Sequence, residues 1–258
     1  MKTSIDCIVL ENQMLSEDIY RIILEKPIDM EKVHAGQFFH IQPAEGGDPF
    51  IRRPISICAL EQDKLHLVIR KEGKGTQAIC SKKPGDKLNL LGPLGNGFTV
   101  SNEKEKVIVV GGGIGTAPML ELTKNLQHKD VKVLLGYRKD PYLVEDFCKI
   151  TPNVQVAVEE GPGDYRGFIT DLLEKEIQKE SADLIYACGP EIMLKKVQQI
   201  GFHFGIKTQL ALEERMACGI GACLVCSCKV KAQENGWHFV RTCKEGPVFT
   251  GEEVIFDA

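Results

Sequence analysis

The pattern of hydrophobic and polar positions changes near residue 100. From residue 5 to about residue 91 it consists of short runs rich in β-branched and aromatic side chains, separated by Gly and Pro. Short strands spaced by turn residues are typical of an antiparallel barrel. The predicted strands cover residues 5–10, 20–24, 38–41, 55–57, 65–69 and 88–90, and we expect one helix after Gly75.

Beyond a polar stretch at residues 101–106, which reads as a linker, the spacing of the apolar runs becomes longer. Predicted strands at residues 107–110, 131–135, 154–158 and 184–187 are separated by segments long enough for helices. This alternation indicates a parallel sheet covered by helices.

The last part of the chain has a third pattern. A strand near residues 208–212 leads into a loop rich in cysteine, and residues 237–240 suggest a small hairpin that closes it. The predicted fold class is therefore β plus α/β. It comprises an N-terminal antiparallel β-barrel (residues 1–100), a central parallel α/β domain (101–212) and a small C-terminal module (213–258).

Composition narrows the choice of partners. The chain has 258 residues, 43% of them hydrophobic, which is enough for a substantial core. Its net charge of −4 is spread along the sequence without a basic block, so we expect neither nucleic acid nor an anionic membrane as a partner. No apolar run is long enough to span a bilayer, and the first residues lack a hydrophobic signal core, so we expect a cytoplasmic protein.

The ten cysteines are unevenly distributed. An intracellular chain keeps its thiols reduced and uses them for metals or chemistry. Four of them follow the pattern Cys218-x4-Cys223-x2-Cys226, with Cys243 sixteen residues further on. This is the spacing of plant-type [2Fe-2S] ligation, and glycines inside the loop suit a backbone that wraps closely around sulfide. We therefore predict that these four cysteines bind a [2Fe-2S] cluster.

Two other interpretations of these cysteines remain open. A structural zinc site normally has two paired knuckles, whereas here the first gap has four residues and the fourth ligand stands alone. Simple packing of thiols is the other interpretation. Within the cluster hypothesis, Cys228 could replace Cys226 as the third ligand, because residues two apart on a strand face the same side. Spacing favours Cys226.

Two segments of the predicted barrel have the chemistry of a flavin site. Arg53-Pro54-Ile55-Ser56 lies where a strand meets a turn and offers a guanidinium for phosphate and a hydroxyl for a polar ring atom. Residues 73–76, Gly-Lys-Gly-Thr, precede the predicted helix and would present amide hydrogens to a pyrophosphate. An exposed basic residue before an edge strand would explain the first segment alone, but together the two segments suggest a dinucleotide flavin.

A glycine-rich turn follows the first parallel strand. Residues 111–118 read Gly-Gly-Gly-Ile-Gly-Thr-Ala-Pro and open a helix, which is the place for a dinucleotide phosphate. The predicted contacts are Gly111, Gly112, Gly113 and Gly115. Thr116 replaces the last glycine of the usual fingerprint, and a purely structural turn is the alternative. Arg138, at the end of the next strand, hints at a 2′-phosphate but is also explained as a surface residue.

Cys188-Gly189-Pro190 ends another parallel strand, at the edge where open α/β sheets bind ligands. These residues could line a nicotinamide pocket, and a buried thiol before a turn is an equally good explanation. The histidines form no cluster with carboxylates at metal or catalytic spacing, so we interpret them as structural or surface residues.

These segments together resemble the ferredoxin reductase superfamily over the whole chain. The matching runs are Arg-Pro-Ile-Ser, Gly-Pro-Leu-Gly-Asn-Gly-Phe at residues 92–98, and the glycine-rich turn at residues 111–118. Residues 213–223, Glu-Glu-Arg-Met-Ala-Cys-Gly-Ile-Gly-Ala-Cys, closely resemble the electron transfer subunits of type B dihydroorotate dehydrogenase. Related ferredoxin:NADP reductase and sulfide dehydrogenase subunits have an acid in place of Cys218.

The resemblance implies a flavin-binding barrel, a pyridine-nucleotide domain and an appended cluster module. The FAD contacts it implies are Arg53, Pro54, Ile55, Ser56, Val68, Ile69, Arg70, Gly75 and Thr76. It also implies a separate FMN-containing catalytic subunit, in a heterotetramer with two copies of each chain. Many reductases have an aromatic residue where Ile55 stands, so the resemblance does not imply ring stacking on the flavin at that position, and the type B dihydroorotate dehydrogenase branch also looks aliphatic there.

The expected function is electron transfer between NAD(H) and that partner through FAD and the cluster, during oxidation of dihydroorotate to orotate. A hydride carries two electrons and a [2Fe-2S] cluster accepts one, so a flavin between them explains why three sites share one chain. We single out no catalytic base or nucleophile. The alternatives are an electron-transfer subunit of another complex, of sulfhydrogenase or ferredoxin:NADP reductase type, and a redox-sensing module without turnover.

Overall fold

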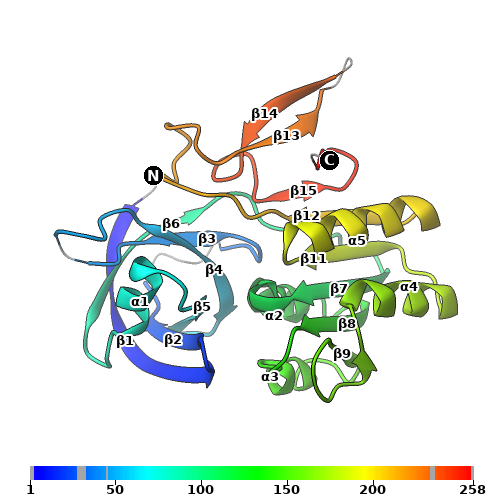
Figure 1. Cartoon of the computed structure of the whole chain (residues 1–258), viewed down its shortest axis with the longest axis horizontal. Coiled ribbons are helices and arrows are strands. Elements are labelled where there is room, and N and C mark those ends of the chain that lie inside the picture. Colours follow the sequence, from blue (N-terminus) through cyan, green and yellow to red (C-terminus); the bar gives the residue numbers. More distant parts are fainter. Residues whose placement is uncertain (1–2, 28–32, 45, 233–235, 257–258) are drawn as a thin grey trace.

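The computed structural model describes residues 3–27, 33–44, 46–232 and 236–256. They form a barrel, an α/β sheet and a small hairpin module that lies above the junction of the other two (Figure 1). The strands are β1 (Thr3–Ser16), β2 (Ile19–Glu25), β3 (Phe38–Ile41), β4 (Arg53–Leu60), β5 (Lys64–Arg70), β6 (Lys87–Leu94), β7 (Lys106–Gly112), β8 (Asp130–Tyr137), β9 (Val154–Val158), β10 (Tyr165–Arg166), β11 (Leu184–Cys188), β12 (Lys207–Ala211), β13 (Ser227–Lys231), β14 (Trp237–Arg241) and β15 (Val248–Thr250). The helices are α1 (Lys74–Cys80), α2 (Thr116–Asn125), α3 (Val144–Cys148), α4 (Ile169–Lys179) and α5 (Glu191–Phe204), with a 3-10 turn η1 at Gly113–Gly115.

In the described part of the chain, the predicted barrel closes with six antiparallel strands in the order β1-β2-β5-β4-β3-β6. Alternate residues of its strands point inward and are fully buried, among them Ile22, Ile57 and Leu67. Register shifts in β1 mark bulges that bend this long strand around the barrel. The helix expected after Gly75 is α1, which begins one residue earlier, at Lys74.

The α/β part is a sheet whose described strands have the order β10-β9-β8-β7-β11-β12-β15. Its central strands are buried on both faces, as strands of a parallel sheet usually are. On β7, Val107 and Val109 face α2 and α3, whereas Ile108 and Val110 face α4 and α5. The fold class predicted from the sequence is confirmed.

Helix α2 joins the barrel to the sheet. It lies between β4 and the face of the sheet that α2 and α3 cover (Figure 1). The core on that face includes the barrel residues Cys58 and Val68. An ion pair adds to this contact, since Arg21 Nη2 of β2 lies 2.5 Å from Asp146 Oδ2 of α3. The barrel and the sheet are therefore packed against each other rather than loosely linked.

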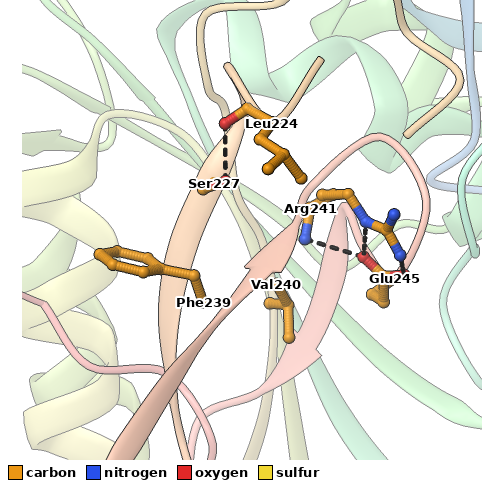
Figure 2. A pocket seen from close by; sticks show the side chains of 6 residues that line it. All are labelled: Leu224, Ser227, Phe239, Val240, Arg241 and Glu245. Carbon is orange, nitrogen blue, oxygen red and sulfur yellow. Dashed lines mark hydrogen bonds and ion pairs between the residues drawn. The ribbon is translucent and has the colours of Figure 1, made fainter. Parts of the chain in front are cut away.

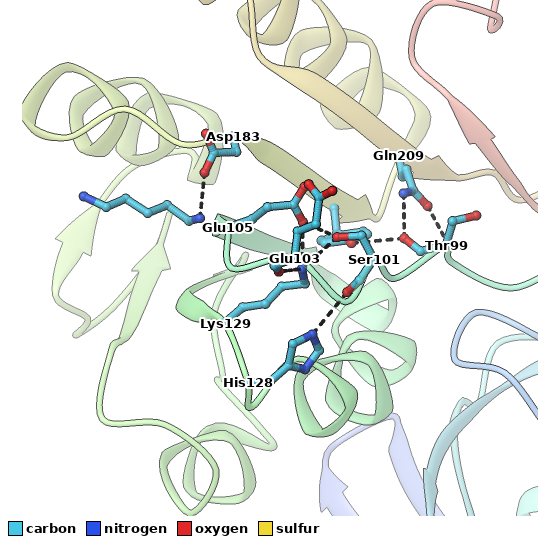
Figure 3. A network of polar contacts seen from close by, with 10 residues as sticks. Thr99, Ser101, Glu103, Glu105, His128, Lys129, Asp183 and Gln209 are labelled. Atoms are coloured by element: carbon cyan, nitrogen blue, oxygen red, sulfur yellow. Dashed lines mark hydrogen bonds and ion pairs between the residues drawn. The ribbon is translucent and has the colours of Figure 1, made fainter.

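The predicted linker at residues 101–106 is held against the sheet by a polar network (Figure 3). The ammonium group of Lys129, whose side chain is fully buried, donates to Ser101 Oγ at 3.0 Å and to the Glu103 carbonyl at 2.6 Å. It also lies 2.7 Å from Glu105 Oε2. A stretch that the sequence marks only as polar thus has a fixed position.

The cysteine module is attached to both other parts. The predicted hairpin is present as β13 and β14, and the chain then returns to the sheet, where β15 pairs antiparallel with β12. On the barrel side, the backbone N–H of Asn96 donates to the Gly246 carbonyl at 2.6 Å. The domain boundaries at residues 100 and 212 stay a prediction. Among the described helices, none combines the length and the apolar character needed to cross a membrane.

Candidate iron-sulfur and nucleotide sites

The four predicted cluster cysteines come from three places near the hairpin. Cys218 and Cys223 lie in the loop after β12, Cys226 directly precedes β13, and Cys243 follows β14. The thiols form two interacting pairs, Cys218 with Cys223 and Cys226 with Cys243. The structure therefore brings all four predicted ligands into one small region.

This paired arrangement suits two metal ions better than one. A [2Fe-2S] cluster takes four thiolates for two irons, whereas a structural zinc ion needs its four ligands around one point. Among the described residues, no group of three or more His, Cys, Asp or Glu side chains is arranged as it would be around a metal ion, so only the thiol pairs are preformed. The donor set thus fits the cluster that the spacing predicts.

The backbone of the loop is shaped to hold negative charge. Burial acts to raise the pKa of the Cys218 thiol, but the N–H groups of Ile220, Cys223 and Ala222 outweigh it and lower that pKa to about 6. The Ala222 N–H lies 3.4 Å from Cys218 Sγ. A thiolate is the form that binds a metal, so the loop favours the required state of its first cysteine.

Glycines allow this conformation. Gly219 has a φ of +69° and Gly221 a φ of +82°, values that L side chains rarely adopt. Arg241 Nη1 donates to the Gly221 carbonyl at 2.8 Å, and the same guanidinium pairs with Glu245. The first of these bonds anchors the loop to the end of β14, and Figure 2 shows the pair that Arg241 forms with Glu245.

The two pairs differ in their exposure. Cys226 and Cys243 are buried and pack against Phe38 of β3 and Leu94 of β6, at the end of the barrel. Cys218 is half-buried and Cys223 is exposed. One side of the site therefore faces the barrel and the other faces solvent.

Cys228 is placed apart from these pairs. The strand β13 begins at Ser227, so the alternation expected from Cys226 to Cys228 does not apply. The Cys228 side chain packs with Val230, Phe249 and Val254 in a separate small core. Burial raises the pKa of this thiol. The contacts favour Cys226 as the third ligand, as the spacing does.

The predicted flavin segments lie on neighbouring strands. Arg53, Pro54, Ile55 and Ser56 start β4, while Val68, Ile69 and Arg70 end β5 beside it. Gly75 and Thr76 lie in α1, and a Cβ built on Gly75 would meet the Arg53 guanidinium at 2.5 to 2.7 Å. The two segments that suggested a dinucleotide flavin are thus in direct contact.

The side chains of these segments divide into two groups. Ile55 and Ile69 point into the barrel core, so any contact they make with a ligand would come from their backbone. Val68 faces the core shared with the sheet, and Arg70 is exposed beside it. The Thr76 hydroxyl accepts from Gly73 N–H at 3.1 Å and closes the turn before α1.

The predicted nucleotide segments meet at the carboxyl edge of the parallel sheet. Gly111 and Gly112 end β7, and Cys188 ends the adjacent strand β11, with Gly111 and Cys188 directly opposite each other. The chain continues from β7 to β8 on one side and later adds β11 on the other, so this is a topological switch point, where such sheets bind ligands.

Glycine is required where the turn after β7 touches the turn after β11. A Cβ on Gly115 would lie 2.5 Å from the Cys188 carbonyl oxygen, and a Cβ on Gly112 would lie 2.4 Å from Met193 Sδ. Gly113 has a φ of +54°, and a Cβ there would lie 3.5 Å from the Arg70 guanidinium. Gly189 and Pro190 complete the edge before α5. Arg70 thus brings the flavin strand next to the nucleotide turn.

Sequence reasoning did not single out two residues at these sites. Tyr142 lies beside Arg70 of β5 and Thr116 at the start of α2, and its buried hydroxyl has no well-aligned hydrogen-bond partner among the described residues. His40 lies between the barrel and the cysteine loop. Neither belongs to a motif, and each reaches its site only through tertiary packing. No local signal could have found them.

Comparisons with known proteins agree with this arrangement. The model of the iron-sulfur cluster binding domain of dihydroorotate dehydrogenase B matches residues 213–255, and that of the oxidoreductase NAD-binding domain matches residues 109–199. The dihydroorotate dehydrogenase B (NAD(+)) electron transfer subunit of Caldanaerobacter subterraneus subsp. tengcongensis is 39% identical over 248 residues, covering 96% of this chain and 97% of the relative. The corresponding subunit of Clostridium perfringens is 39% identical over 252 residues, covering 96% of this chain and 96% of the relative.

Among solved structures, an NADH-dependent reduced ferredoxin-NADP oxidoreductase superimposes with a TM-score of 0.85 at 27% identity, covering 96% of this chain and 89% of that one. The Amycolatopsis cytochrome P450 reductase GcoB superimposes with a TM-score of 0.68 at 22% identity, covering 79% and 67%. The second likeness concerns the fold alone.

Proposed function

The chain belongs to the family of dihydroorotate dehydrogenase B (NAD(+)) electron transfer subunits, and we propose that it passes electrons between NAD(H) and a catalytic subunit through FAD and a [2Fe-2S] cluster. The observation that carries this proposal is the packing of Cys226 and Cys243 on Phe38 and Leu94. It puts the cysteine loop against the barrel that carries the flavin segments. This electron transfer serves the oxidation of dihydroorotate to orotate, a step of pyrimidine biosynthesis.

We assign the cluster to Cys218, Cys223, Cys226 and Cys243. The FAD contacts are Arg53, Pro54, Ile55, Ser56, Val68, Ile69, Arg70, Gly75 and Thr76. The NAD(H) contacts are Gly111, Gly112, Gly113, Gly115, Cys188, Gly189 and Pro190. When bound, FAD exchanges electrons in pairs with the nicotinamide and singly with the cluster.

The chain's own residues bind and orient these groups. The Arg53 guanidinium and the first amides of α1 are held together to meet the flavin phosphates. The glycine contacts between η1 and the turn after β11 keep the nucleotide edge open for a pyrophosphate. Phe38 and Leu94 keep water away from the buried cysteine pair. We assign no acid, base or nucleophile in this chain.

The exposed side of the cysteine loop is the proposed docking surface for the catalytic subunit. Ile220, Leu224 and Val225 are 47%, 63% and 52% exposed around the exposed Cys223. Apolar side chains gathered on a surface are typical of protein interfaces. A pocket of about 690 Å³, lined by Leu224, Phe239 and Arg241 among others, lies beside them (Figure 2). We propose that the partner contains FMN and that two copies of each chain assemble. The cytoplasmic location also stays a prediction.

The activity test uses the full chain purified alone and with its partner. Alone, it should oxidise NADH with an artificial dye and leave orotate unreduced. With the catalytic subunit added, orotate reduction should appear. Reduction of orotate by the chain alone would contradict the proposal, and so would negligible dye reduction by a preparation that contains FAD and iron.

The docking surface has its own test. Leu224→Asp combined with Val225→Asp should leave NADH oxidation with the dye unchanged and reduce copurification of the catalytic subunit, because charge on an apolar contact costs desolvation energy. The matched control is Phe168→Asp, which changes an exposed apolar residue at the start of α4. Equal copurification for both variants would exclude this surface.

A second candidate is an electron-transfer subunit of another NAD(P)H-linked complex. It is favoured by the likeness to the ferredoxin-NADP oxidoreductase structure, which covers 96% of this chain. The partner that copurifies with the chain distinguishes the two candidates. A flavin and iron-sulfur protein without a dihydroorotate dehydrogenase subunit would support the second.

A further inference from the structure

His40 is a fully buried histidine at the contact between the barrel and the cysteine loop. It lies in β3, two residues after Phe38, which packs against the buried cysteine pair. Histidine is seldom buried completely, since its ring has two polar nitrogens. The position therefore calls for an explanation.

The imidazole ring lies directly on the cysteine loop. A Cβ built on Gly219, the residue after Cys218, would lie 2.4 Å from His40 Nδ1 and 3.1 Å from its Cγ. The backbone groups of Cys218 and Arg52 also lie beside the ring. Gly219 thus lets the loop approach the histidine closely, so a polar side chain of the barrel lies beside the segment that carries the first cysteine.

The strand that carries the ring is held in place, but the two ring nitrogens lack well-aligned hydrogen-bond partners. Arg52 Nη1 donates to the His40 carbonyl at 3.0 Å and to the Asn89 carbonyl at 3.1 Å, so the strand cannot easily move. Neither Nδ1 nor Nε2 has a well-aligned hydrogen-bond partner within the described residues, although the backbone of Cys218 and Arg52 lies close enough to interact with the ring. A buried polar group without a well-aligned partner is destabilising, and such a group often marks a ligand or redox site.

We propose that His40 is a positioning residue for the cluster, holding the Cys218–Gly219 segment on the barrel and directing a ring N–H toward the first ligand. The inference rests on the proposed function, because it takes Cys218 as a ligand. An imidazole ring has at least one N–H in either protonation state. Dipoles near the sulfur atoms and exclusion of solvent set the reduction potential of such clusters.

The test compares His40→Asn with His40→Leu in the full chain carrying FAD and the cluster. The two side chains have nearly the same shape, so both leave a similar space, but only asparagine keeps an N–H near the Nδ1 position. In His40→Leu we expect a more negative cluster potential, a changed electron paramagnetic resonance spectrum and about tenfold slower reduction of the cluster by NADH. His40→Asn should lie close to the wild type in all three.

The matched control is His66→Leu. His66 lies in β5 on another side of the barrel, with Nε2 at 3.3 Å from Glu61, and its replacement should leave the cluster spectrum and potential unchanged. Equal potentials and spectra for the leucine and asparagine variants at position 40 would overturn the inference. If either variant loses its cluster, the iron contents of His40→Leu and His40→Asn are compared instead. Equal losses of iron in the two variants would also overturn the inference. A wild-type chain without cluster absorption would instead contradict the proposed function.

Discussion

The guanidinium of Arg53 lies against the backbone of Gly75, so close that a Cβ on Gly75 would meet Arg53 Nε at 2.5 Å. Residue 75 is in the first turn of α1, and Arg53 begins β4. Two segments 22 positions apart therefore share one location, and glycine at position 75 leaves room for the guanidinium where it now lies. This contact links the best flavin motif of the sequence to the helix that follows it.

Gly75→Ala should lower the affinity for FAD about tenfold, because the new methyl group displaces the guanidinium that we assign to the flavin phosphates. The fold should be kept, since the end of an arginine side chain can move. Flavin release measured by fluorescence, together with a thermal melt, tests both statements. Gly73→Ala is the control, since a Cβ there would meet no heavy atom of the described chain within 4 Å. Equal affinities for the two variants would contradict the assignment.

Cys226→Ser should abolish the visible absorption of the cluster, whereas Cys228→Ser should keep it. Cys226 packs with Cys243, while Cys228 belongs to the core formed with Val230, Phe249 and Val254. Absorption spectra and iron analysis of both variants provide the measurement. A cluster that survives loss of Cys226 and disappears on loss of Cys228 would reverse the ligand assignment.

Glu160→Ala should raise kcat/KM for NADPH several-fold and change that for NADH little. Glu160 Oε1 lies 3.1 Å from Arg138 Nε at the carboxyl edge of the sheet, where it neutralises the charge that would attract a 2′-phosphate. Steady-state rates with a dye acceptor measure the ratio. Glu174→Ala, a change of charge on α4, is the control. If both variants shift the ratio equally, general electrostatics rather than a local contact sets the preference.

Lys129→Met should destabilise the fold by about 2 kcal/mol. The change removes a buried ammonium that joins Ser101, Glu103 and Glu105 (Figure 3). The Glu103 carbonyl loses this donor, and Glu105 Oε2 keeps only the Ser101 hydroxyl. Denaturant unfolding measures the difference. Lys106→Met removes a lysine whose ion pair with Glu180 is exposed, and it should change stability little. A similar loss for both variants would show that burial of the network is not what matters.

Glu176 should make stability depend on pH in the acid range. Burial acts to raise the pKa of its carboxyl, but hydrogen bonds from Lys132 and Lys179 outweigh burial and lower that pKa from 4.5 to about 2. The folded state thus binds the proton less readily than the unfolded state. The resulting stability is present above pH 4.5 and is lost as the pH falls toward 2.

Replacing the carboxyl isolates this effect. Glu176→Gln should be less stable than the wild type by on the order of 1 to 2 kcal/mol at neutral pH, allowing for solvent around Lys179. The difference should shrink between about pH 4.5 and pH 2. Unfolding curves of both proteins over this range provide the test. A constant difference would mean that the charge of Glu176 does not contribute.

Much of the architecture was predictable because its signals are local. Alternating apolar positions marked the barrel strands, and continuous apolar runs marked the central strands of the sheet. The predicted first strand ends at Leu10, whereas β1 continues to Ser16, because bulges after Val9 and Met14 break the alternation. Strand β15 has three residues, too few for a period to be visible, and pairing with β12 alone defines it.

The candidate sites likewise combine features that local sequence shows with features that only tertiary packing creates. Spacing was enough to propose Cys218, Cys223, Cys226 and Cys243 as ligands, since the loop that carries three of them is local. The surfaces on which they lie could not be read in this way. Phe38 and His40 come from a barrel strand far away in sequence, and only the closed barrel brings them to the loop.

The return of the chain to the sheet through β15 has a consequence for shortened versions of the protein. A chain cut after residue 212 would lose the antiparallel partner of β12 and would uncover a row of unpaired backbone groups on that strand. Such an edge invites pairing with other copies. The last segment therefore also protects the edge of the sheet against self-association. A reductase without the cysteine module would need another way to protect the edge of β12, so simple truncation of this chain would not be enough.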